Sequence, residues 1–419
     1  MKILFICDYF PPFIKGGGEI STYWQAKKLI EEKIKVLVLA PKYKDIIKFK
    51  KDKIKIFWYQ LPFKLKSASP IIFLNPIYTS FLFFKIVKVC QKENIDLLHC
   101  QGKYSAPAAV LAKLFLKLPL VLTLRDYRGI CNHGFCLYKD SKACNLFSFF
   151  KKDFLVYFKN YIKNKNILTF FLQAFASFLG RINTFFLAFF MKKADRFICV
   201  SNFVATIYIN NGFAEDKMVT VYNTTPKINI NEVKIPKAVK QKIGQYKYVF
   251  LYAGKLSLGK GAGVLIAAAK KIIKTRSDIL FIFAGKLHYP IKKFKSSQLV
   301  FLGKLKHQLL IKIMSLVDVV CLPSLWPEPL SRVTLEAFSM GKPILSSNVG
   351  GQKELVSKKR GWLFKPNEIE LIKSINESLK ERHKWKSMAS NAKKYAASLE
   401  NRQIKKLISL YSFCINKLY

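Results

Sequence analysis

Residues 318–338 contain the stretch that decides the fold: Asp318-Val319-Val320-Cys321-Leu322-Pro323-Ser324-Leu325-Trp326-Pro327-Glu328-Pro329-Leu330-Ser331-Arg332-Val333-Thr334-Leu335-Glu336-Ala337-Phe338. Its apolar run is continuous rather than alternating, as in a strand that is covered on both faces. Glu328 lies in the loop and Glu336 in the second helical turn, so both carboxylates could accept hydrogen bonds from hydroxyls of one ligand. We expect the N–H groups of Leu330 and Ser331 to point to the same place. In the plainer interpretation, Glu336 pairs with a lysine and Glu328 is simply exposed.

Short apolar runs alternate with helix-length segments along the whole chain. The runs cover residues 3–7, 36–40, 97–100, 120–124, 197–200, 249–252, 280–283, 300–302, 319–322 and 343–346, and the helical segments include 18–32, 106–116, 263–274 and 331–340. Because this alternation occurs twice, we predict an α/β fold with two doubly wound parallel sheets. Asparagine, lysine and proline displace the apolar pattern over residues 226–245, where we expect a linker. The domains are therefore expected at 1–225 and 240–399.

A glycine-rich segment follows the first apolar run of each half. Gly16 and Gly17 open a helical segment in the first half, where backbone N–H groups favour an anion. Gly254, Lys255 and Lys260 hold the corresponding position in the second half. Fixed cations there would stabilise the negative charge that builds on a departing nucleoside diphosphate. In a chain with 72 lysines and arginines, however, two loop lysines alone would be typical of a solvated surface.

Together these segments resemble the glycosyl transferases group 1 family, the family-4 retaining glycosyltransferases. The resemblance rests on residues 16–19, 96–99, 123–126, 194–201, 223 and 254–261 and on the Glu–x7–Glu pattern of Glu328 and Glu336. It implies a GT-B fold, in which two Rossmann-like domains face each other across a cleft and a C-terminal helix at 400–419 packs back on the first. The donor would bind mainly to the second domain and the acceptor to the first. No Asp-x-Asp motif occurs in the chain, which agrees with the metal-independent chemistry of this fold, so we expect no cofactor and no catalytic metal.

The resemblance also implies a role for each matching residue. Lys255 and Lys260 would hold the donor diphosphate. Glu328 would contact the transferred sugar, and Glu336 would contact the ribose hydroxyls. The expected catalytic residues are Glu328, Lys255, Lys260, Arg125 and Asp126, and the expected donor-binding residues are Gly16, Gly17, Gly254, Leu330, Ser331 and Glu336.

Two positions depart from the family pattern. Lys255 stands where the family commonly has arginine, which keeps the charge but loses the bidentate geometry. The family's Thr-x-His-Asp pattern reads Thr123-Leu124-Arg125-Asp126 here, and arginine cannot act as a general base at neutral pH. Retention by front-face return, in which the leaving phosphate accepts the acceptor's proton, needs no protein base. Arg125 could bind phosphate or an acidic acceptor, or help to position Asp126.

The composition is globular, with an extreme positive charge. The 419 residues are 51% hydrophobic and carry a formal net charge of +47, mostly from lysine. Proteins that read nucleic-acid sequence depend on arginine for bidentate contacts, and abundant Ile, Phe, Asn and Lys are typical of an AT-rich coding sequence. We therefore expect an anionic membrane surface or a phosphorylated substrate as partner, and no nucleic acid.

The nine cysteines lie mostly in apolar runs, which is typical of buried side chains in a reducing compartment. Cys131, Cys136 and Cys144 are the exception, because they cluster in one polar segment. No CxxC motif and no histidine-rich pattern accompanies them. We therefore expect redox-inert loop cysteines rather than a metal site.

Residues 149–193 mix aromatic and aliphatic side chains with lysines. Amphipathic helices with basic faces bind anionic lipid surfaces, although a pair of core-packing helices gives the same pattern. The uncharged segment 166–180 is short for a bilayer span, and Pro70 and Pro76 interrupt the segment 67–84, so we expect no transmembrane helix. The run at 3–7 is expected to be a strand rather than a signal peptide. We expect a cytoplasmic protein, soluble or peripheral on the membrane.

The expected function is transfer of a sugar from a UDP- or GDP-linked donor to a glycan or lipid-linked acceptor, in cell-surface polysaccharide or glycolipid assembly. An epimerase would use the same donor site without transferring the sugar. A catalytically impaired GT-B scaffold would account for the substitutions at Arg125 and Lys255. A basic nucleic-acid binder is the remaining alternative, and steeply salt-sensitive duplex binding would identify it.

Overall fold

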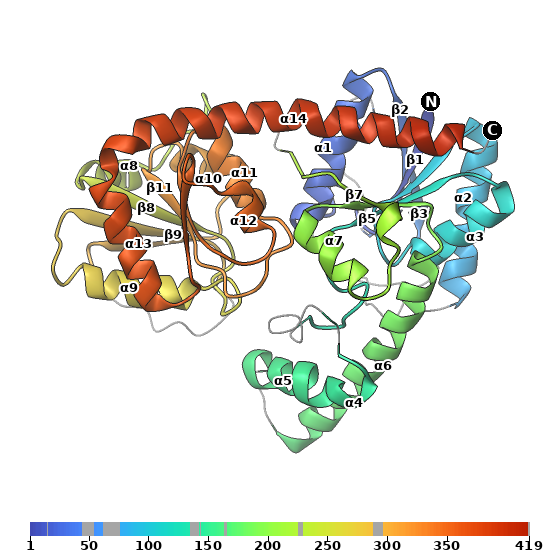
Figure 1. Cartoon of the computed structure of the whole chain (residues 1–419), viewed down its shortest axis with the longest axis horizontal. Coiled ribbons are helices and arrows are strands. Elements are labelled where there is room, and N and C mark those ends of the chain that lie inside the picture. The colour runs from blue at the N-terminus through green and yellow to red at the C-terminus, as the bar shows by residue number, and fades with distance from the viewer. Residues whose placement is uncertain are drawn as a thin grey trace. The chain divides into compact units, whose positions relative to one another are not determined.

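The computed structural model of the chain describes residues 1–14, 16–43, 54–61, 76–134, 142, 144–162, 166–224, 229–287 and 296–417. The chain divides into two compact units, one formed by Met1–Asn223 with Arg402–Tyr419 and the other by Thr224–Asn401. Each unit contains one parallel sheet with helices around it (Figure 1). The predicted α/β fold class with two doubly wound sheets is confirmed.

The sheet of the first unit has seven strands in the described residues, in the order β3-β2-β1-β4-β5-β6-β7. The strands are β1 (Lys2–Ile6), β2 (Lys35–Lys42), β3 (Lys55–Gln60), β4 (Leu97–Cys100), β5 (Leu120–Leu124), β6 (Arg196–Cys199) and β7 (Met218–Thr220). Every neighbouring pair is parallel. The chain order reverses between β1 and β4, and loops at the carboxyl ends of those two strands form the usual ligand crevice of such a sheet.

Helices cover this sheet and build an extension on one side of it (Figure 1). They are α1 (Gly17–Glu31), α2 (Pro76–Glu93), α3 (Ala106–Leu116), α4 (Leu146–Phe149), the π-helical turn η3 (Phe150–Phe154), α5 (Leu155–Tyr161), α6 (Ile167–Met191) and α7 (Asn202–Ile209). The core packs β1 and β2 against α1 and against the end of the last helix, through Leu407, Leu410, Tyr411 and Cys414. Residues 402–419 therefore belong to the first unit, although they are the last in the chain.

The sheet of the second unit has six strands in the described part of the chain, in the order β10-β9-β8-β11-β12-β13. The strands are β8 (Tyr248–Ala253), β9 (Ile279–Ala284), β10 (Leu299–Gly303), β11 (Val319–Leu322), β12 (Ile344–Ser347) and β13 (Gly361–Phe364). All pairs are again parallel, and the order reverses between β8 and β11. The helices are α8 (Lys237–Gly244), α9 (Ala262–Ile272), α10 (His307–Met314), α11 (Arg332–Ser339), α12 (Gln352–Leu355), α13 (Glu368–Lys380) and α14 (Trp385–Asn416).

Several elements differ from the sequence expectation. Strands β3, β7 and β13, which lie at sheet edges, were not predicted. Most residues of β3 and β7 are only partly buried, and β13 is a four-residue strand that begins with a glycine. The expected linker at 226–245 contains the helix α8, none of whose residues is buried, while residues 225–228 lie outside the described residues. The C-terminal segment forms one helix, Trp385–Asn416, which begins well before the C-terminal helix expected at 400–419.

The expectation of no transmembrane helix stays a prediction, and one described helix bears on it by its length and composition. In the described residues, α6 is long and apolar enough to cross a membrane, and 33% of its most apolar window is buried. The helix continues past the uncharged segment 166–180 and includes Arg181, whose buried guanidinium donates to the carbonyls of Ile130 and Cys144. One side of α6 also packs against α3, so protein rather than lipid surrounds that side.

Candidate active site

The predicted residues of the second unit lie at the carboxyl ends of β8 and β11, the two strands at which its chain order reverses. The loop after β8 and the loop after β11 are joined by backbone hydrogen bonds, because the N–H groups of Leu325 and Trp326 both donate to the Gly259 carbonyl at 3.0 Å. Gly261 has a φ of +67°, and a Cβ atom there would lie 1.6 Å from the Pro323 carbonyl oxygen. Only glycine fits at this position, so the lysine loop is held close to the proline-rich loop.

Glu328 is buried in that proline-rich loop, with its side chain 8% exposed and paired with Lys260. Its backbone is fixed as well, since the Gly351 N–H donates to the Glu328 carbonyl at 2.7 Å. At Gly350, which has a φ of +61°, a Cβ atom would lie 2.3 Å from the same carbonyl oxygen. The interpretation of Glu328 as an exposed surface residue is therefore wrong. Lys260 is 40% exposed, so its ammonium group remains accessible to a ligand.

Glu336 lies in α11, whose first turn is capped by the Ser331 hydroxyl, which accepts from the Thr334 N–H at 3.4 Å. The side chain of Glu336 is 5% exposed. Its Oε1 atom lies 3.0 Å from His307 Nε2 and accepts from Arg332 Nη2 at 3.1 Å. Its partners are thus histidine and arginine instead of the lysine considered from the sequence. Both contacts use Oε1, which directs the polar interactions of this carboxylate to one of its two oxygens.

Gly254 and Lys255 complete the donor-side residues predicted from the sequence. Gly254 has a φ of +149°, and its carbonyl oxygen lies so close to Gly285 that a Cβ atom there would be 1.7 Å away. The carbonyl of Lys255 accepts from the Tyr252 hydroxyl at 2.7 Å, and the Lys255 side chain is exposed. Burial, and then the charge of Glu328, raise the pKa of Tyr252. The structure thus places Lys255, Lys260 and Glu328 in the loops at the carboxyl ends of β8 and β11.

In the first unit, Arg125 follows β5 and is held by three side chains. Its guanidinium donates to Asn223 Oδ1 at 2.8 Å, to Gln101 Oε1 at 2.6 Å and to Thr22 Oγ1 at 3.3 Å. A Cβ atom at Gly18 would lie 3.4 Å from the Arg125 side chain, so the start of α1 packs directly on it. Gly17 is the first residue of α1, and the Gly16 N–H donates to Glu19 Oε2 at 2.8 Å.

Asp126 makes ion pairs with Lys103 at 2.9 Å and with Arg128 at 2.8 Å. Burial alone would raise the pKa of Asp126, but the charges of these two cations outweigh it and lower the pKa below its usual range. The carboxylate therefore stays ionised at neutral pH. Since both of its oxygens accept from Lys103, its role in this arrangement is to fix the neighbouring cations.

Sequence reasoning missed His99 and Asp8, which are also buried, near the carboxyl ends of β4 and β1. His99 Nε2 lies 2.7 Å from Thr123 Oγ1, and Nδ1 lies 2.6 Å from the Tyr411 hydroxyl. Burial, and then the charge of Arg125, lower the pKa of His99, so its imidazole is neutral. The signal for His99 was present, because residues 96–99 are part of the family resemblance.

Asp8 follows β1 and accepts from the Ser105 hydroxyl at 2.6 Å and from the backbone N–H groups of Tyr104 and Ser105 at 3.1 and 3.0 Å. Burial raises the pKa of Asp8 despite these bonds. The sequence contained a signal for Asp8, because a carboxylate directly after the first strand lies where ligands of such sheets bind.

In the second unit, sequence reasoning also missed His307, one of only five histidines in the chain.

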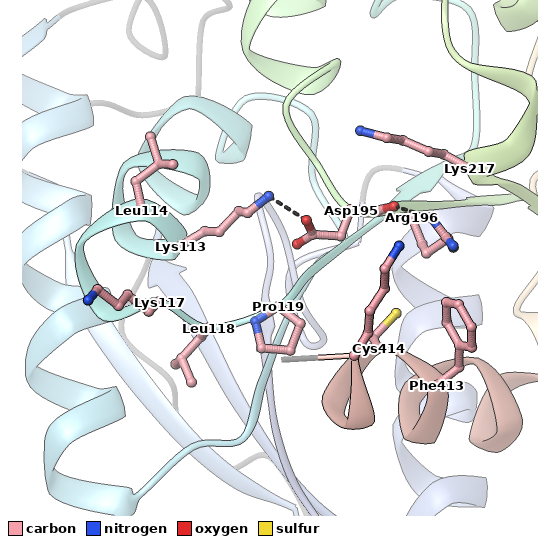
Figure 2. Close-up of a pocket in the computed structure, with 11 residues that line it drawn as sticks. Lys113, Leu114, Lys117, Leu118, Pro119, Asp195, Arg196, Lys217, Phe413 and Cys414 are labelled. Atoms are coloured by element: carbon pink, nitrogen blue, oxygen red, sulfur yellow. Dashed lines mark hydrogen bonds and ion pairs between the residues drawn. The ribbon is translucent and has the colours of Figure 1, made fainter. Parts of the chain in front are cut away.

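A pocket of about 480 Å³ lies elsewhere on the first unit (Figure 2). It is lined by residues at the amino ends of β5, β6 and β7 and by the end of α14, among them Pro119, Lys217 and Phe413. Figure 2 shows the ion pair between Lys113 and Asp195, which spans 2.5 Å. The predicted residues lie at the carboxyl ends of the strands, and none of them lines this pocket. It therefore has no part in the chemistry considered below.

Two family descriptions match the sequence. Residues 15–225 match the family described as Glycosyltransferase Family 4, and residues 234–395 match the one described as Glycosyl transferases group 1. Spore coat protein SA of Bacillus subtilis (strain 168) is 25% identical over 232 residues, which are 50% of this chain and 62% of that protein. Across three curated relatives, including that protein, the match spans between 49% and 62% of the relative's length.

One longer match is to the GPI3 subunit of phosphatidylinositol N-acetylglucosaminyltransferase from Saccharomyces cerevisiae (strain ATCC 204508 / S288c). It is 23% identical over 392 residues, which are 90% of this chain and 75% of that protein. Among solved structures, Anabaena HepE in complex with UDP is 20% identical and has a TM-score of 0.65, covering 98% of this chain and 100% of that one. At this identity the likeness to HepE shows the fold.

Proposed function

This chain belongs to Glycosyltransferase Family 4, and we propose that it transfers a sugar from a nucleoside diphosphate donor with retention of configuration. The observation that carries the proposal is two buried carboxylates in the segment after β11, the strand at which the chain order of the second sheet reverses. Glu328 pairs with Lys260, and Glu336 contacts His307 and Arg332. Carboxylates accept hydrogen bonds from sugar hydroxyls, and fixed cations stabilise a departing diphosphate. The match to the group 1 description over the same unit supports this assignment.

In the proposed donor complex, the diphosphate takes the place of Glu328 as the partner of Lys260. The released carboxylate of Glu328 then accepts hydrogen bonds from the transferred sugar, and Lys255 provides the second cation. Glu336 accepts from the ribose hydroxyls through the oxygen that its contacts with His307 and Arg332 leave available. The neighbouring glycines Gly350 and Gly351 allow the ligand to approach the backbone.

The chemical step is a front-face exchange. The bond between the anomeric carbon and the leaving phosphate oxygen breaks, and a bond to the acceptor hydroxyl oxygen forms on the same face. The acceptor's proton passes to the phosphate oxygen, so no protein base is required. Arg125 and Asp126 agree with this scheme, since the first cannot accept a proton and the pKa of Asp126 is low. We propose that Arg125 binds an anionic group on the acceptor side, and that the cations replace a divalent metal.

We propose UDP- or GDP-linked sugars as donors. The HepE complexes with UDP and with UDP-glucose support the UDP-linked class. On the acceptor side we propose a glycan or a lipid-linked glycan in the assembly of surface polysaccharide or glycolipid. The relative named as a phosphatidylinositol N-acetylglucosaminyltransferase subunit supports an acceptor held in a membrane.

The surface of α6 is a second support for a membrane-bound acceptor. Its buried side includes the polar residues Ser177, Arg181 and Thr184, which is the reverse of a helix in a soluble protein. Its exposed side, here called the apolar face of α6, consists of Ile167, Leu168, Phe171, Leu172, Phe175, Phe178, Leu179, Phe185, Phe186 and Phe189. Exposed apolar surface of this extent marks an interaction site, which supports the membrane interpretation over a helix pair that packs only in the core.

We propose that the apolar face of α6 rests on an anionic lipid surface at the cytoplasmic side of a membrane. Lys192 and Lys193 are exposed at the end of α6, and Lys151 and Lys152 are exposed in the preceding η3 turn. Lysines beside an inserted apolar face bind anionic headgroups. The inward contacts of Arg181 fix one side of the helix to the protein, which favours a helix that lies on the surface over one that crosses the bilayer.

A transfer assay with labelled nucleotide sugars and membrane extracts tests the proposed reaction. Glu328→Gln keeps the side-chain size but removes the charge, and the rate of transfer should fall about 100-fold or more. Glu370→Gln is the matched control, because Glu370 is an acid of the same unit that pairs with Lys373 at its surface. Unchanged transfer by Glu328→Gln would contradict the proposed site. Release of an epimerised nucleotide sugar instead of a glycoside would identify an epimerase, and no turnover of any donor by the wild type would identify a scaffold.

A further inference from the structure

Three metal-ligating side chains meet at the base of the extension formed by α4, α5 and α6. The side chains of Cys131, Cys144 and Asp153 are buried, and their ligand atoms all lie within 4.8 Å of one another. They come from separate segments: Cys131 from the loop after β5, Cys144 from two residues before α4, and Asp153 from the π-helical turn η3. We propose that this cluster binds one zinc ion, which fastens the extension to the sheet.

The types of the three ligand atoms and the distances between them fit a zinc ion. Thiolate sulfurs bind Zn²⁺ at about 2.3 Å and carboxylate oxygens at about 2.0–2.2 Å, which places the ligand atoms of a tetrahedral site roughly 3.5–3.8 Å apart. The separations of at most 4.8 Å would therefore close by about 1 Å when the ion enters. Two sulfurs with one carboxylate favour zinc over magnesium or calcium, which take oxygen ligands.

The surroundings hold the three ligands in place. Arg181 of α6 donates to the carbonyl of Cys144, one of the ligands, and to the carbonyl of Ile130 at 2.7 Å, which precedes another. The backbone N–H of His133 donates to Asp153 Oδ2 at 3.2 Å, which orients that carboxylate. Such contacts behind the ligands are what metal sites use to fix their geometry.

The charges of the three ligands and of Arg181 are a further reason to place a zinc ion in this cluster. Two thiolates and a carboxylate carry three negative charges, which a divalent ion and the guanidinium of Arg181 together neutralise. The Arg181 side chain is itself buried, and its hydrogen bonds within the described residues go to the carbonyls of Ile130 and Cys144 and to the Thr184 hydroxyl. A buried cation beside the cluster is stabilised when the cluster carries negative charge.

Asp153 is placed by an unusual element. It lies in η3, a π-helical turn between α4 and α5, and π-helical turns are rare and occur frequently at functional sites.

The sequence expectation of inert loop cysteines was based on the lack of a CxxC spacing. That rule could not detect this cluster, because the third ligand is a carboxylate nine residues beyond Cys144. Cys136 lies outside the described residues.

Metal analysis of the full chain tests the inference. The chain is expressed with added zinc, desalted without chelator and analysed by elemental mass spectrometry, and about one zinc per chain is expected. X-ray absorption at the zinc edge should show two sulfur ligands. Asp153→Asn and Cys144→Ser should each lower the zinc affinity about tenfold or more. Cys90→Ser, at a buried cysteine of α2 in the same unit, is the matched control and should keep the zinc.

Three outcomes would overturn the inference. The chain could purify without zinc and fail to take up Zn²⁺ or Co²⁺ in a titration. The Asp153→Asn and Cys144→Ser variants could both keep zinc as tightly as the wild type. Mass spectrometry of the intact native chain could also show a disulfide joining Cys131 to Cys144. The metal content and the disulfide are measured on the wild-type chain, so the test does not depend on whether the cysteine variant folds.

Discussion

The side chain of Arg125 occupies the position where the family pattern has a histidine, and another histidine, His99, is buried beside it. The side chain of Gln101 connects the two. Its Oε1 atom accepts from Arg125 at 2.6 Å, and its Nε2 atom lies 3.2 Å from both ring nitrogens of His99. Protonation of His99 would place a second cation in this buried network. A neutral His99 therefore avoids charge repulsion with the guanidinium of Arg125.

The neutral state of His99 predicts a pH dependence of stability. Burial, and then Arg125, lower the folded-state pKa of His99, while in the unfolded chain its pKa is about 6.5. Below that value the unfolded chain binds a proton that the folded chain does not. The contribution to the free energy of unfolding is thus complete above about pH 6.5 and decreases on acidification, by at most roughly 1.4 kcal/mol per pH unit.

Urea unfolding between about pH 7.5 and about pH 5.5 measures this effect. His99→Gln should show a shallower loss of stability with acidification than the wild type. His383→Gln, at an exposed histidine of the second unit, should keep the wild-type pH dependence. Identical curves for wild type and His99→Gln would show that His99 is not a neutral buried group.

At the scale of elements, α6 has the least usual sequence pattern of the described helices. Its buried side includes serine, threonine and arginine, and its exposed side is phenylalanine and leucine. Covering this exposed side with an apolar environment is favourable, and an exposed apolar surface of this size marks an interaction site. The proposed lipid surface supplies that environment, and Arg181 keeps the helix attached to the protein.

Replacing the apolar face of α6 should reduce membrane binding. In Phe171→Gln combined with Phe175→Gln, two exposed aromatic side chains lose their contact with lipid, each worth about 1.5–3 kcal/mol. Binding to vesicles of phosphatidylglycerol and phosphatidylcholine should fall about tenfold or more in a sedimentation assay. Ile369→Gln on α13, where Ile369 is 65% exposed, is the control and should bind as the wild type does. Wild-type binding by the double variant, or no binding by the wild type at moderate salt, would exclude this surface.

At the scale of the whole molecule, the proposed function requires that donor nucleotide stabilise the folded chain. A ligand at about 100 times its Kd adds about 2.7 kcal/mol to the free energy of unfolding, which is a rise in Tm of roughly 5–10 °C for a unit of this size. Thermal unfolding with UDP and with GDP should give this rise for one of the two nucleotides. Glu336→Gln should reduce it, and Glu370→Gln should not.

No shift with either nucleotide would contradict the proposed donor site. A shift that is the same in Glu336→Gln as in the wild type would instead place the nucleotide elsewhere. This assay needs no acceptor, so it separates failure of donor binding from a wrong choice of acceptor.

The sequence alone determined the fold class and the position of several candidate residues directly after strands of the second sheet. Continuous apolar runs show a strand buried on both faces, and glycines and acids directly after such runs must lie at the carboxyl edge of a parallel sheet. For that reason Lys255, Lys260 and Glu328 could be assigned to one place before the structure. The edge strands β3, β7 and β13 were not predicted, because β3 and β7 are only partly buried and β13 is four residues long and begins with a glycine.

Only the tertiary structure decided which side chains are partners across distant parts of the chain. His307 with Glu336, Tyr411 with His99, and Cys131 with Cys144 and Asp153 are brought together by folding, and no spacing rule connects them. It also decided that α6 turns its arginine inward and its phenylalanines outward, because periodicity shows that two faces differ but not which one is buried. Local pattern therefore determined the sheets and the loops that follow their strands, and packing determined the side-chain partners and the exposed faces.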